Sequence, residues 1–290
     1  MMNVTIRPAA PADAERCASI LYEAFKAIAD QHNFPPDFAS VEDALDTTRP
    51  LIAHPKVYSL VAECEGEVVG SIFLYERDPV RGYGPMSVDS RFQGRGIGRQ
   101  LVEATHERAR NAISLRGVQD AFNVLSMSLY TLHDWIVKEP LLLMTGRPKS
   151  APVPGIEVRR LQYPDLGECN ALCTRIIGFP RANELRDVQW IPVCAPYVAV
   201  RDGRITAYLT APGFWSLNHG VAETEEDMRA LLVGAAAATE QPLSLLVPTR
   251  DTSFFRWCLD EGLRAISPKT LMVLGEYRDP DGCYFPSVLY

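Results

Sequence analysis

Residues 88–101 combine glycines and arginines in a pattern that suits an anionic ligand. The glycines are Gly94, Gly96 and Gly98, and the arginines are Arg91, Arg95 and Arg99. Glycine accepts positive φ and lets a ligand approach the backbone, because it has no Cβ. A helical pattern begins directly after the glycines, and the first turn of a helix offers unpaired N–H groups and a positive dipole end. We therefore expect a diphosphate-binding loop with extra positive charge from the three arginines.

Two common nucleotide-binding loops do not match this one. A dinucleotide fold requires G-x-G-x-x-G after a first strand, with an acidic residue ~20 positions further on. A P-loop requires Gly-Lys-Ser/Thr. Here the spacing is G-x-G-x-G, no lysine follows, and several elements precede the loop. The simplest alternative is a glycine turn before an ordinary helix.

Two motifs resemble those of the GNAT acetyltransferase superfamily. Gln93-x-x-Gly96-x-Gly98 resembles its coenzyme A signature, Gln/Arg-x-x-Gly-x-Gly/Ala. About 30 residues later, Asn123-x-x-Ser126-x-x-x-Tyr130 resembles the family's Asn-x-x-Ala-x-x-x-Tyr. The Gly-Phe that often follows is replaced by Asp134-Trp135, so the end of that helix departs from the family pattern, although Asp tolerates the left-handed conformation better than most residues.

The resemblance implies a set of roles for individual residues, with acetyl-CoA as co-substrate. The main chain from Gln93 through Gly94, Arg95, Gly96, Ile97 and Gly98 to Arg99 should hold the coenzyme A diphosphate. The strand end Met86, Ser87 and Val88 should pair its main chain with the pantetheine arm, as an added strand would. Asn123 and Ser126 should contact the arm from the other side, and Tyr130 should lie near the thioester sulfur.

These roles describe direct attack of a neutral amine on the acetyl carbonyl. An N–H near Val88 would stabilise the oxyanion, and the Tyr130 hydroxyl would donate to the leaving thiolate. Residues 82–87 contain no carboxylate, so we name no general base. The alternative roles are structural: Tyr130 as a core tyrosine, and Asn123 as the cap of the next helix.

Composition narrows the class of protein. The chain has 290 residues, 47% of them hydrophobic, and a net charge of −7 without any Lys/Arg-rich run, so we expect no nucleic-acid partner. No apolar stretch approaches the ~18 residues of a membrane span, and the start lacks a signal-peptide pattern, so we expect a cytoplasmic protein without membrane contact. The seven scattered cysteines suit reduced thiols and complete no metal site.

The element pattern predicts an α/β (α+β) protein with two GNAT-like domains, each a mixed, splayed sheet flanked by helices. Residues 1–145 form the acetyl-CoA-binding domain and residues 156–290 a second domain. Residues 146–155, with three prolines and two glycines, form the linker. Strand, helix, hairpin, helix, strand, helix and strand follow one another twice, which suggests a duplication. The helix after the glycine loop is expected over 97–113, and the strand after it over 118–124.

The second domain lacks the glycine loop. Residues 219–227 carry four acids at a helix start, where a pyrophosphate would be repelled by about 1 to 4 kcal/mol per close contact. We expect a degenerate domain that does not bind coenzyme A in the usual way. The apolar tail, residues 284–290, should pack against a domain face or a partner subunit.

The resemblance implies that the protein is an N-acetyltransferase that moves an acetyl group from acetyl-CoA to an amine of a small molecule or peptide. The alternatives are a non-catalytic acyl-CoA sensor and an acyltransferase that uses a longer acyl group. A homodimer is left open. The acceptor and the acyl-chain length are not determined by the sequence.

Overall fold

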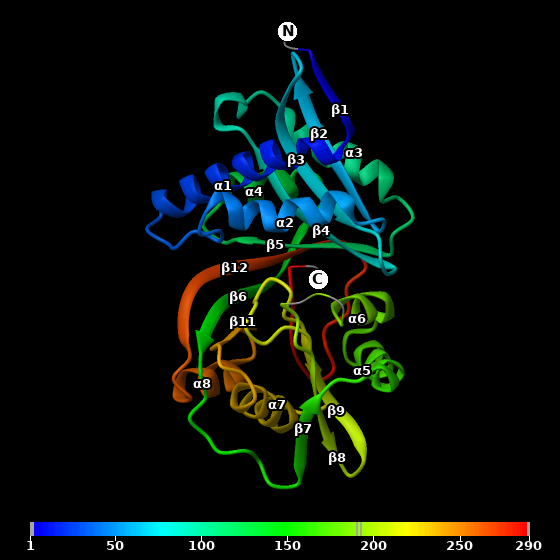
Figure 1. The fold of residues 1–290 in the computed structure, drawn as a ribbon, viewed down its shortest axis with the longest axis vertical. Coiled ribbons are helices and arrows are strands. Elements are labelled where there is room, and N and C mark those ends of the chain that lie inside the picture. Colours follow the sequence, from blue (N-terminus) through cyan, green and yellow to red (C-terminus); the bar gives the residue numbers. More distant parts are fainter. Residues whose placement is uncertain (1–2, 190, 192, 289–290) are drawn as a thin grey trace.

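The structure is a computed structural model that describes residues 3–189, 191 and 193–288, and it has two halves stacked along the long axis (Figure 1). The elements of the first half are β1 (Val4–Pro8), η1 (Pro11–Asp13), α1 (Ala14–Gln31), α2 (Val41–Ala53), β2 (Val57–Cys64), β3 (Glu67–Tyr75), β4 (Val80–Val88), η2 (Ser90–Phe92), α3 (Ile97–Arg108), β5 (Ser114–Asp120), α4 (Val124–Thr131) and β6 (Ile136–Gly146).

The second half repeats this order. Its elements are β7 (Ile156–Arg160), η3 (Tyr163–Asp165), α5 (Leu166–Ile177), α6 (Ala182–Val188), β8 (Tyr197–Arg201), β9 (Arg204–Leu209), β10 (Gly220–Ala222), α7 (Glu225–Ala237), β11 (Leu243–Pro248), α8 (Thr252–Asp260), β12 (Arg264–Gly275) and β13 (Cys283–Phe285). The sequence pattern missed α6, β10 and β13.

Two predicted boundaries in the first half are wrong. The helix α3 ends at Arg108 with Ala109 as its C-cap, and Ile113, which the prediction included in the helix, is 39% exposed. The strand β5 covers 114–120 instead of 118–124. Ala109 and Ile113 continue the spacing of Leu101 and Thr105, so periodicity alone does not show where the helix ends.

The halves also repeat local detail. The Arg7 guanidinium donates to both carboxylate oxygens of Asp13 at 2.8 and 3.0 Å. In the second half, Arg159 binds Asp165 in the same way at 2.7 and 3.0 Å. Each aspartate also accepts a backbone N–H three residues before it. A duplication predicts this repeat of both contacts, in addition to the repeated element order.

One eight-stranded sheet joins the halves in the order β1-β2-β3-β4-β5-β12-β6-β11. The strand β12 of the second half therefore lies between β5 and β6 of the first, and β6 lies between β12 and β11. Met272 of β12 packs in the core of the first half, and Met144 of β6 packs in the core of the second. Each half thus completes the sheet of the other.

Helices cover both faces of the first half of the sheet. Val68 and Val69 are neighbours on β3, so their side chains point to opposite faces. Val68 packs against Cys17 and Ile20 of α1, whereas Val69 shares a cluster with Leu101 of α3. The glycine loop before α3 and the α1–α2 layer therefore lie on different faces. Across the described residues, every helix is too short or too polar to span a lipid bilayer.

Candidate cofactor and catalytic site

The glycine loop joins the end of β4 to the start of α3. Gly94 and Gly96 have φ of +73° and +80°, which L side chains rarely adopt. A Cβ at either position would meet no protein atom within 4 Å, so the space over the loop is open. Gly98 differs from the expectation of a positive φ: it is helical, and its missing Cβ lets Leu129 of α4 approach, since an added Cβ would lie 3.3 Å from that side chain.

The N-terminus of α3 is suited to an anion. Gly96 caps the helix with no side-chain hydrogen bond, and the first turn contains no acidic residue. The first intrahelical bond is donated by Gln100 to the Gly96 carbonyl. The N–H groups before Gln100 therefore have no partner within the helix and lie at the positive end of its dipole. The residues present fit a diphosphate at this point.

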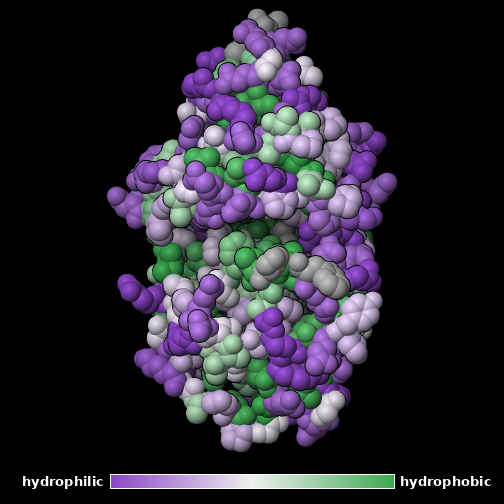
Figure 2. Space-filling model, in the orientation of Figure 1, coloured by the Kyte–Doolittle hydropathy of each residue, from purple (hydrophilic) through white to green (hydrophobic). Residues whose placement is uncertain are grey.

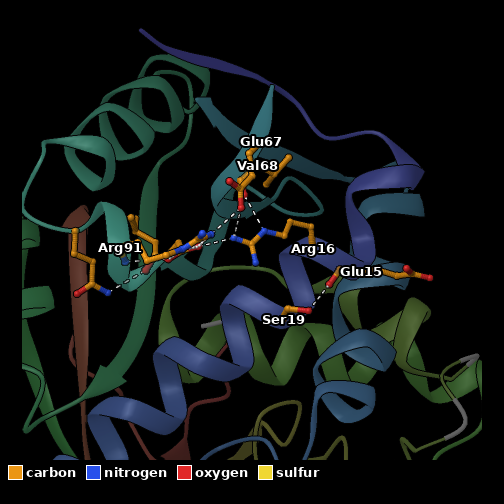
Figure 3. A network of polar contacts seen from close by, with 9 residues as sticks. Glu15, Arg16, Ser19, Glu67, Val68 and Arg91 are labelled. Atoms are coloured by element: carbon orange, nitrogen blue, oxygen red, sulfur yellow. Dashed lines mark hydrogen bonds and ion pairs between the residues drawn. The ribbon is translucent and has the colours of Figure 1, made fainter. Parts of the chain in front are cut away.

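Arg91 faces away from the loop, whereas the sequence predicted that all three arginines add positive charge to it. Its guanidinium donates to Asp89 and to Glu67 of β3, at 2.7 Å each, and Arg16 of α1 joins the same network (Figure 3). The hydrogen bonds from Arg91 outweigh the opposing effect of burial and lower the pKa of Asp89 to about 2. This network anchors the turn that begins the loop.

The other two arginines lie closer to the loop. Arg95 stacks over the Phe92 ring, with its guanidinium carbon 5.7 Å from the ring centroid. Arg99 is 70% exposed and pairs with Glu103 one turn further along α3. Arg91 and Arg99 are therefore paired with carboxylates, whereas the main-chain N–H groups at the start of α3 remain as donors for an anion.

The strands β4 and β5 separate beside the loop. They are paired in parallel at Val80, Arg81 and Gly82, after which β12 is the only described strand that pairs with β5. We call the unpaired remainder of the two strands the first splay. The Asp89 N–H donates to Val69 of β3, so by strand alternation the Val88 N–H points to the opposite side, into the first splay. Met86, two residues earlier, has the same orientation.

Gln93 has a second role that the sequence pattern did not indicate. Its side-chain amide donates to the Val88 carbonyl at 3.0 Å. The loop is thereby attached to the last residue of β4. The family signature places a glutamine here. In this structure the Gln93 side chain fixes the distance between the end of β4 and the N-terminus of α3.

The helix α4 forms the other wall of the first splay. Asn123 caps this helix, because its carbonyl oxygen accepts the Ser126 N–H at 3.1 Å. Both roles considered for Asn123 are therefore compatible, since the cap engages its oxygen and leaves its NH2 group as a donor. Tyr130 lies one turn beyond Ser126. Burial raises the pKa of Tyr130 to about 12, against a hydrogen bond with Ser126 that lowers it, so the phenol stays protonated at neutral pH.

Tyr130 belongs to an aromatic cluster with Tyr83 and Trp135. The ring centroids of Tyr83 and Trp135 lie 5.7 and 5.4 Å from that of Tyr130, and those two rings lie 4.7 Å apart. The Trp135 N–H donates to His106 Nε2 at 2.9 Å, so this histidine has a structural role as the acceptor that holds the Trp135 ring in place. Among the described residues, the buried Tyr83 hydroxyl has no hydrogen-bond partner. No sequence motif marks Tyr83, and its position beside Tyr130 and Trp135 follows from the fold.

The fold and the loop together fit one class of protein, the acyltransferases that take their acyl group from coenzyme A. More specifically, residues 19–134 match the model of the acetyltransferase (GNAT) family, so the chain contains a domain of this family. The matched region includes the glycine loop, Asn123 and Tyr130. The predicted family is confirmed for this region. No curated protein sequence matches the chain.

Solved structures share the fold over nearly the whole chain. A putative acetyltransferase from Pyrococcus horikoshii is 17% identical with a TM-score of 0.74, and the match covers 99% of this chain and 94% of that one. A GCN5-related N-acetyltransferase from Sphaerobacter thermophilus is 16% identical with a TM-score of 0.61, over 97% and 98%. A tandem GNAT protein from the clavulanic acid biosynthesis pathway is 13% identical with a TM-score of 0.59, over 94% and 98%. The predicted mixed α/β fold class is confirmed.

Proposed function

We propose that the chain is an N-acetyltransferase that transfers the acetyl group of acetyl-CoA to a primary amine of a small molecule or peptide. The observation that carries this proposal is the first splay, which begins at an uncapped helix N-terminus with open space over its glycines. A diphosphate bound there would place the arm of coenzyme A along β4. The reactive end of the cofactor would then lie near the point where the two strands meet.

The chain's own groups supply the remaining chemistry. Bound acetyl-CoA supplies an activated acyl carbonyl. The Val88 N–H, which points into the first splay, is placed to stabilise negative charge on that carbonyl oxygen. The Tyr130 hydroxyl, protonated because its pKa is about 12, donates a hydrogen bond or proton to the leaving sulfur. Attack by the neutral amine is direct, and no residue of this chain is assigned as general base.

The closed end of the first splay favours a short acyl group. A Cβ on Gly117, the first residue of β5 beyond the paired segment, would lie 3.1 Å from the Tyr83 carbonyl oxygen and 3.8 Å from the Trp135 ring. The backbones therefore touch where the strands meet, and two aromatic rings lie directly beside them. These contacts support acetyl over the longer chains that the sequence left open.

The second half contributes to the α1–α2 face of the same sheet. Lys269 of β12 is buried and donates to Asp37, between α1 and α2, at 2.7 Å and to Asp120, at the end of β5, at 2.6 Å. The Trp215 ring stacks over the Lys269 ammonium at 4.8 Å. Apolar side chains gather around the waist between the halves (Figure 2). We infer that the amine approaches from this face, with the second half as one wall.

A turnover screen tests the proposal. The full chain is incubated with acetyl-CoA and a broad panel of primary amines, and the free thiol released is measured. We expect amine-dependent thiol release that requires Tyr130. Tight coenzyme A binding without turnover across the panel would instead identify an acyl-CoA sensor. Failure of coenzyme A to bind in calorimetry would refute both.

A further inference from the structure

The second sheet has five strands in the order β13-β10-β9-β8-β7, and β13, the last described strand, lies at its edge. It pairs antiparallel with β10 through the partners Gly220–Phe285, Val221–Tyr284 and Ala222–Cys283. On its other side it lies against β11. Figure 1 shows this red C-terminal segment passing between the strands of the second half. The predicted packing of the apolar tail is therefore within the chain itself for residues 284–288, and residues 289–290 lie outside the described residues.

The position of β13 corresponds to the first splay. In each half the fourth strand leads into a helix, which is followed by the fifth strand: β4, α3 and β5 in the first half, and β10, α7 and β11 in the second. The third residue after each fifth strand caps the next helix in the same way. Asn123 accepts the N–H of Ser126, and Asp251 accepts the N–H of Phe254, each three residues on. The space between β10 and β11 is thus the second splay.

The strand β13 fills the second splay closely. Phe285 is fully buried, and a Cβ on Gly220 would lie 2.4 Å from its ring. Cys283 is 4% exposed, and its sulfur lies 4.0 Å from the carboxylate of Asp251, the counterpart of Asn123. The edge of β10 that would otherwise be unpaired is hydrogen-bonded to the chain's own backbone. Within residues 3–189, 191 and 193–288, no strand lies in the first splay.

The surroundings of the second splay agree with a resident strand and not with an anion. The side chain of Thr224 caps the helix α7, which begins with Glu225, Glu226 and Asp227. The corresponding N-cap of α3 is Gly96, which offers no side-chain cap. Three carboxylates at this position complement the helix dipole on their own. Cys258 stands seven residues after Asp251, where Tyr130 stands seven after Asn123. The proposed hydroxyl donor is therefore missing as well.

We propose that β13 is a permanent internal occupant of the second splay, which pairs with β10 as the arm of an acyl-CoA would pair with β4. The chain then has one cofactor site, in the first half. The analogy with the cofactor arm rests on the proposed function, whereas the occupancy of the second splay by β13 does not. Beyond β13, the tail continues to the first half, where Val288 packs near Phe73 and Tyr75.

Thiol labelling of the full chain tests this occupancy, because Cys283 lies on β13 and all seven cysteines are buried. Iodoacetamide labelling is followed by peptide mass spectrometry in the wild type and in Gly220→Ala. The added methyl group collides with Phe285, so we expect Cys283 to be labelled at least about tenfold faster as β13 is released. Cys17 of α1 should stay protected in both. Equal labelling rates at Cys283 would overturn the proposal.

Two controls keep the test decisive. Gly167→Ala adds a methyl group where no atom lies within 4 Å, and it should leave Cys283 protected. The double variant Gly220→Ala/Phe285→Ala removes the collision and should restore folding if Gly220→Ala alone does not fold. In that case Cys283 is compared between Phe285→Ala and the wild type. Loss of the buried ring should loosen β13 and speed the labelling of Cys283, and labelling as slow as in the wild type would contradict the role of the ring.

Acetyl-CoA provides a third arm of the experiment. Saturating acetyl-CoA should leave the labelling of Cys283 in the wild type unchanged, because β13 is not displaced. Faster labelling in its presence would show that the second splay is a competing cofactor site and would overturn the proposal. If acetyl-CoA fails to bind the chain at all, the proposed function fails, and the comparison of wild type with Gly220→Ala still decides the occupancy.

Discussion

Replacement of Gly96 by alanine tests the loop on which the site depends. Gly96 has φ of +80°, and the φ of Gly203, in the turn between β8 and β9, is +75°. A Cβ at either position meets no atom within 4 Å. The left-handed conformation costs an L-residue about 1 to 2 kcal/mol. Gly96→Ala and Gly203→Ala should therefore lower the free energy of unfolding by the same amount, and Gly203→Ala serves as a matched control for backbone strain.

The two variants should differ in coenzyme A binding. The methyl group at position 96 enters the open space over the N-terminus of α3, where the unpaired N–H groups point. Loss of one charge-assisted hydrogen bond to the diphosphate costs about 1.5 to 3 kcal/mol. That loss corresponds to roughly 10- to 100-fold weaker affinity. Gly203→Ala should bind with the affinity of the wild type, since its turn lies in the second half.

Calorimetric titration with coenzyme A, together with urea unfolding of each variant, measures both effects. The reasoning fails if Gly96→Ala retains the wild-type affinity while it shows the same loss of stability as Gly203→Ala. That result would mean that the diphosphate does not contact the loop. A larger stability loss at Gly96 than at Gly203 would instead point to native contacts of the loop that the strain argument omits.

Three further outcomes follow from the same geometry. Tyr130→Phe should lower turnover by about 100-fold or more with unchanged coenzyme A affinity, and full turnover of this variant in a thiol-release assay would exclude the Tyr130 hydroxyl as the donor. Since the pKa of Tyr130 is about 12, ionisation of this hydroxyl should not limit wild-type activity below about pH 10. Because Tyr83 and Trp135 close the first splay, acetyl-CoA should react at least about tenfold faster than butyryl-CoA, and equal rates would contradict that closure. Asp89→Asn should lower the free energy of unfolding by about 1 to 2 kcal/mol above pH 3.8, the ordinary pKa of aspartate. The difference from the wild type should vanish as the pH falls through about 2, where the carboxyl of the folded protein takes up its proton. Urea unfolding at several pH values measures this difference, and a difference that persists below that range would rule out the ion pair with Arg91 as its cause.

Local sequence signals predicted the first half of the fold and the position of the loop. The hairpin of β2 and β3 joins two strand-like apolar runs through a turn that contains Glu65-Gly66, both of which have positive φ in the structure. Asp134, which replaces the family's glycine, has φ of +65°, as its tolerance of this conformation predicted. These signals are local, because turn chemistry and helical spacing depend only on neighbouring residues.

The features that sequence reasoning missed depend on contacts between distant segments. Tyr83 becomes important only because Tyr130 and Trp135 meet it from α4 and the start of β6. The strand β13 has three residues, and its identity as a strand depends on β10, more than 60 residues earlier. The roles of the site residues themselves, and the division into two domains at 146–155, remain predictions.

The shared sheet predicts that the first half does not fold without the second. After Arg116, which pairs with Gly82 of β4, the only partner of β5 among the described strands is β12. Leu271, Met272 and Val273 of β12 are at most 1% exposed. Burial of three such side chains contributes about 1.5 to 3 kcal/mol each, which approaches the 5 to 15 kcal/mol that stabilises a whole domain. A chain that ends at residue 155 should therefore lack cooperative thermal unfolding by circular dichroism and should not bind coenzyme A. A cooperative, coenzyme A-binding fragment would show that β12 is dispensable. If the fragment does not fold, the second half has a structural role that needs no cofactor, because it supplies the strand β12 that completes the sheet beside the first splay.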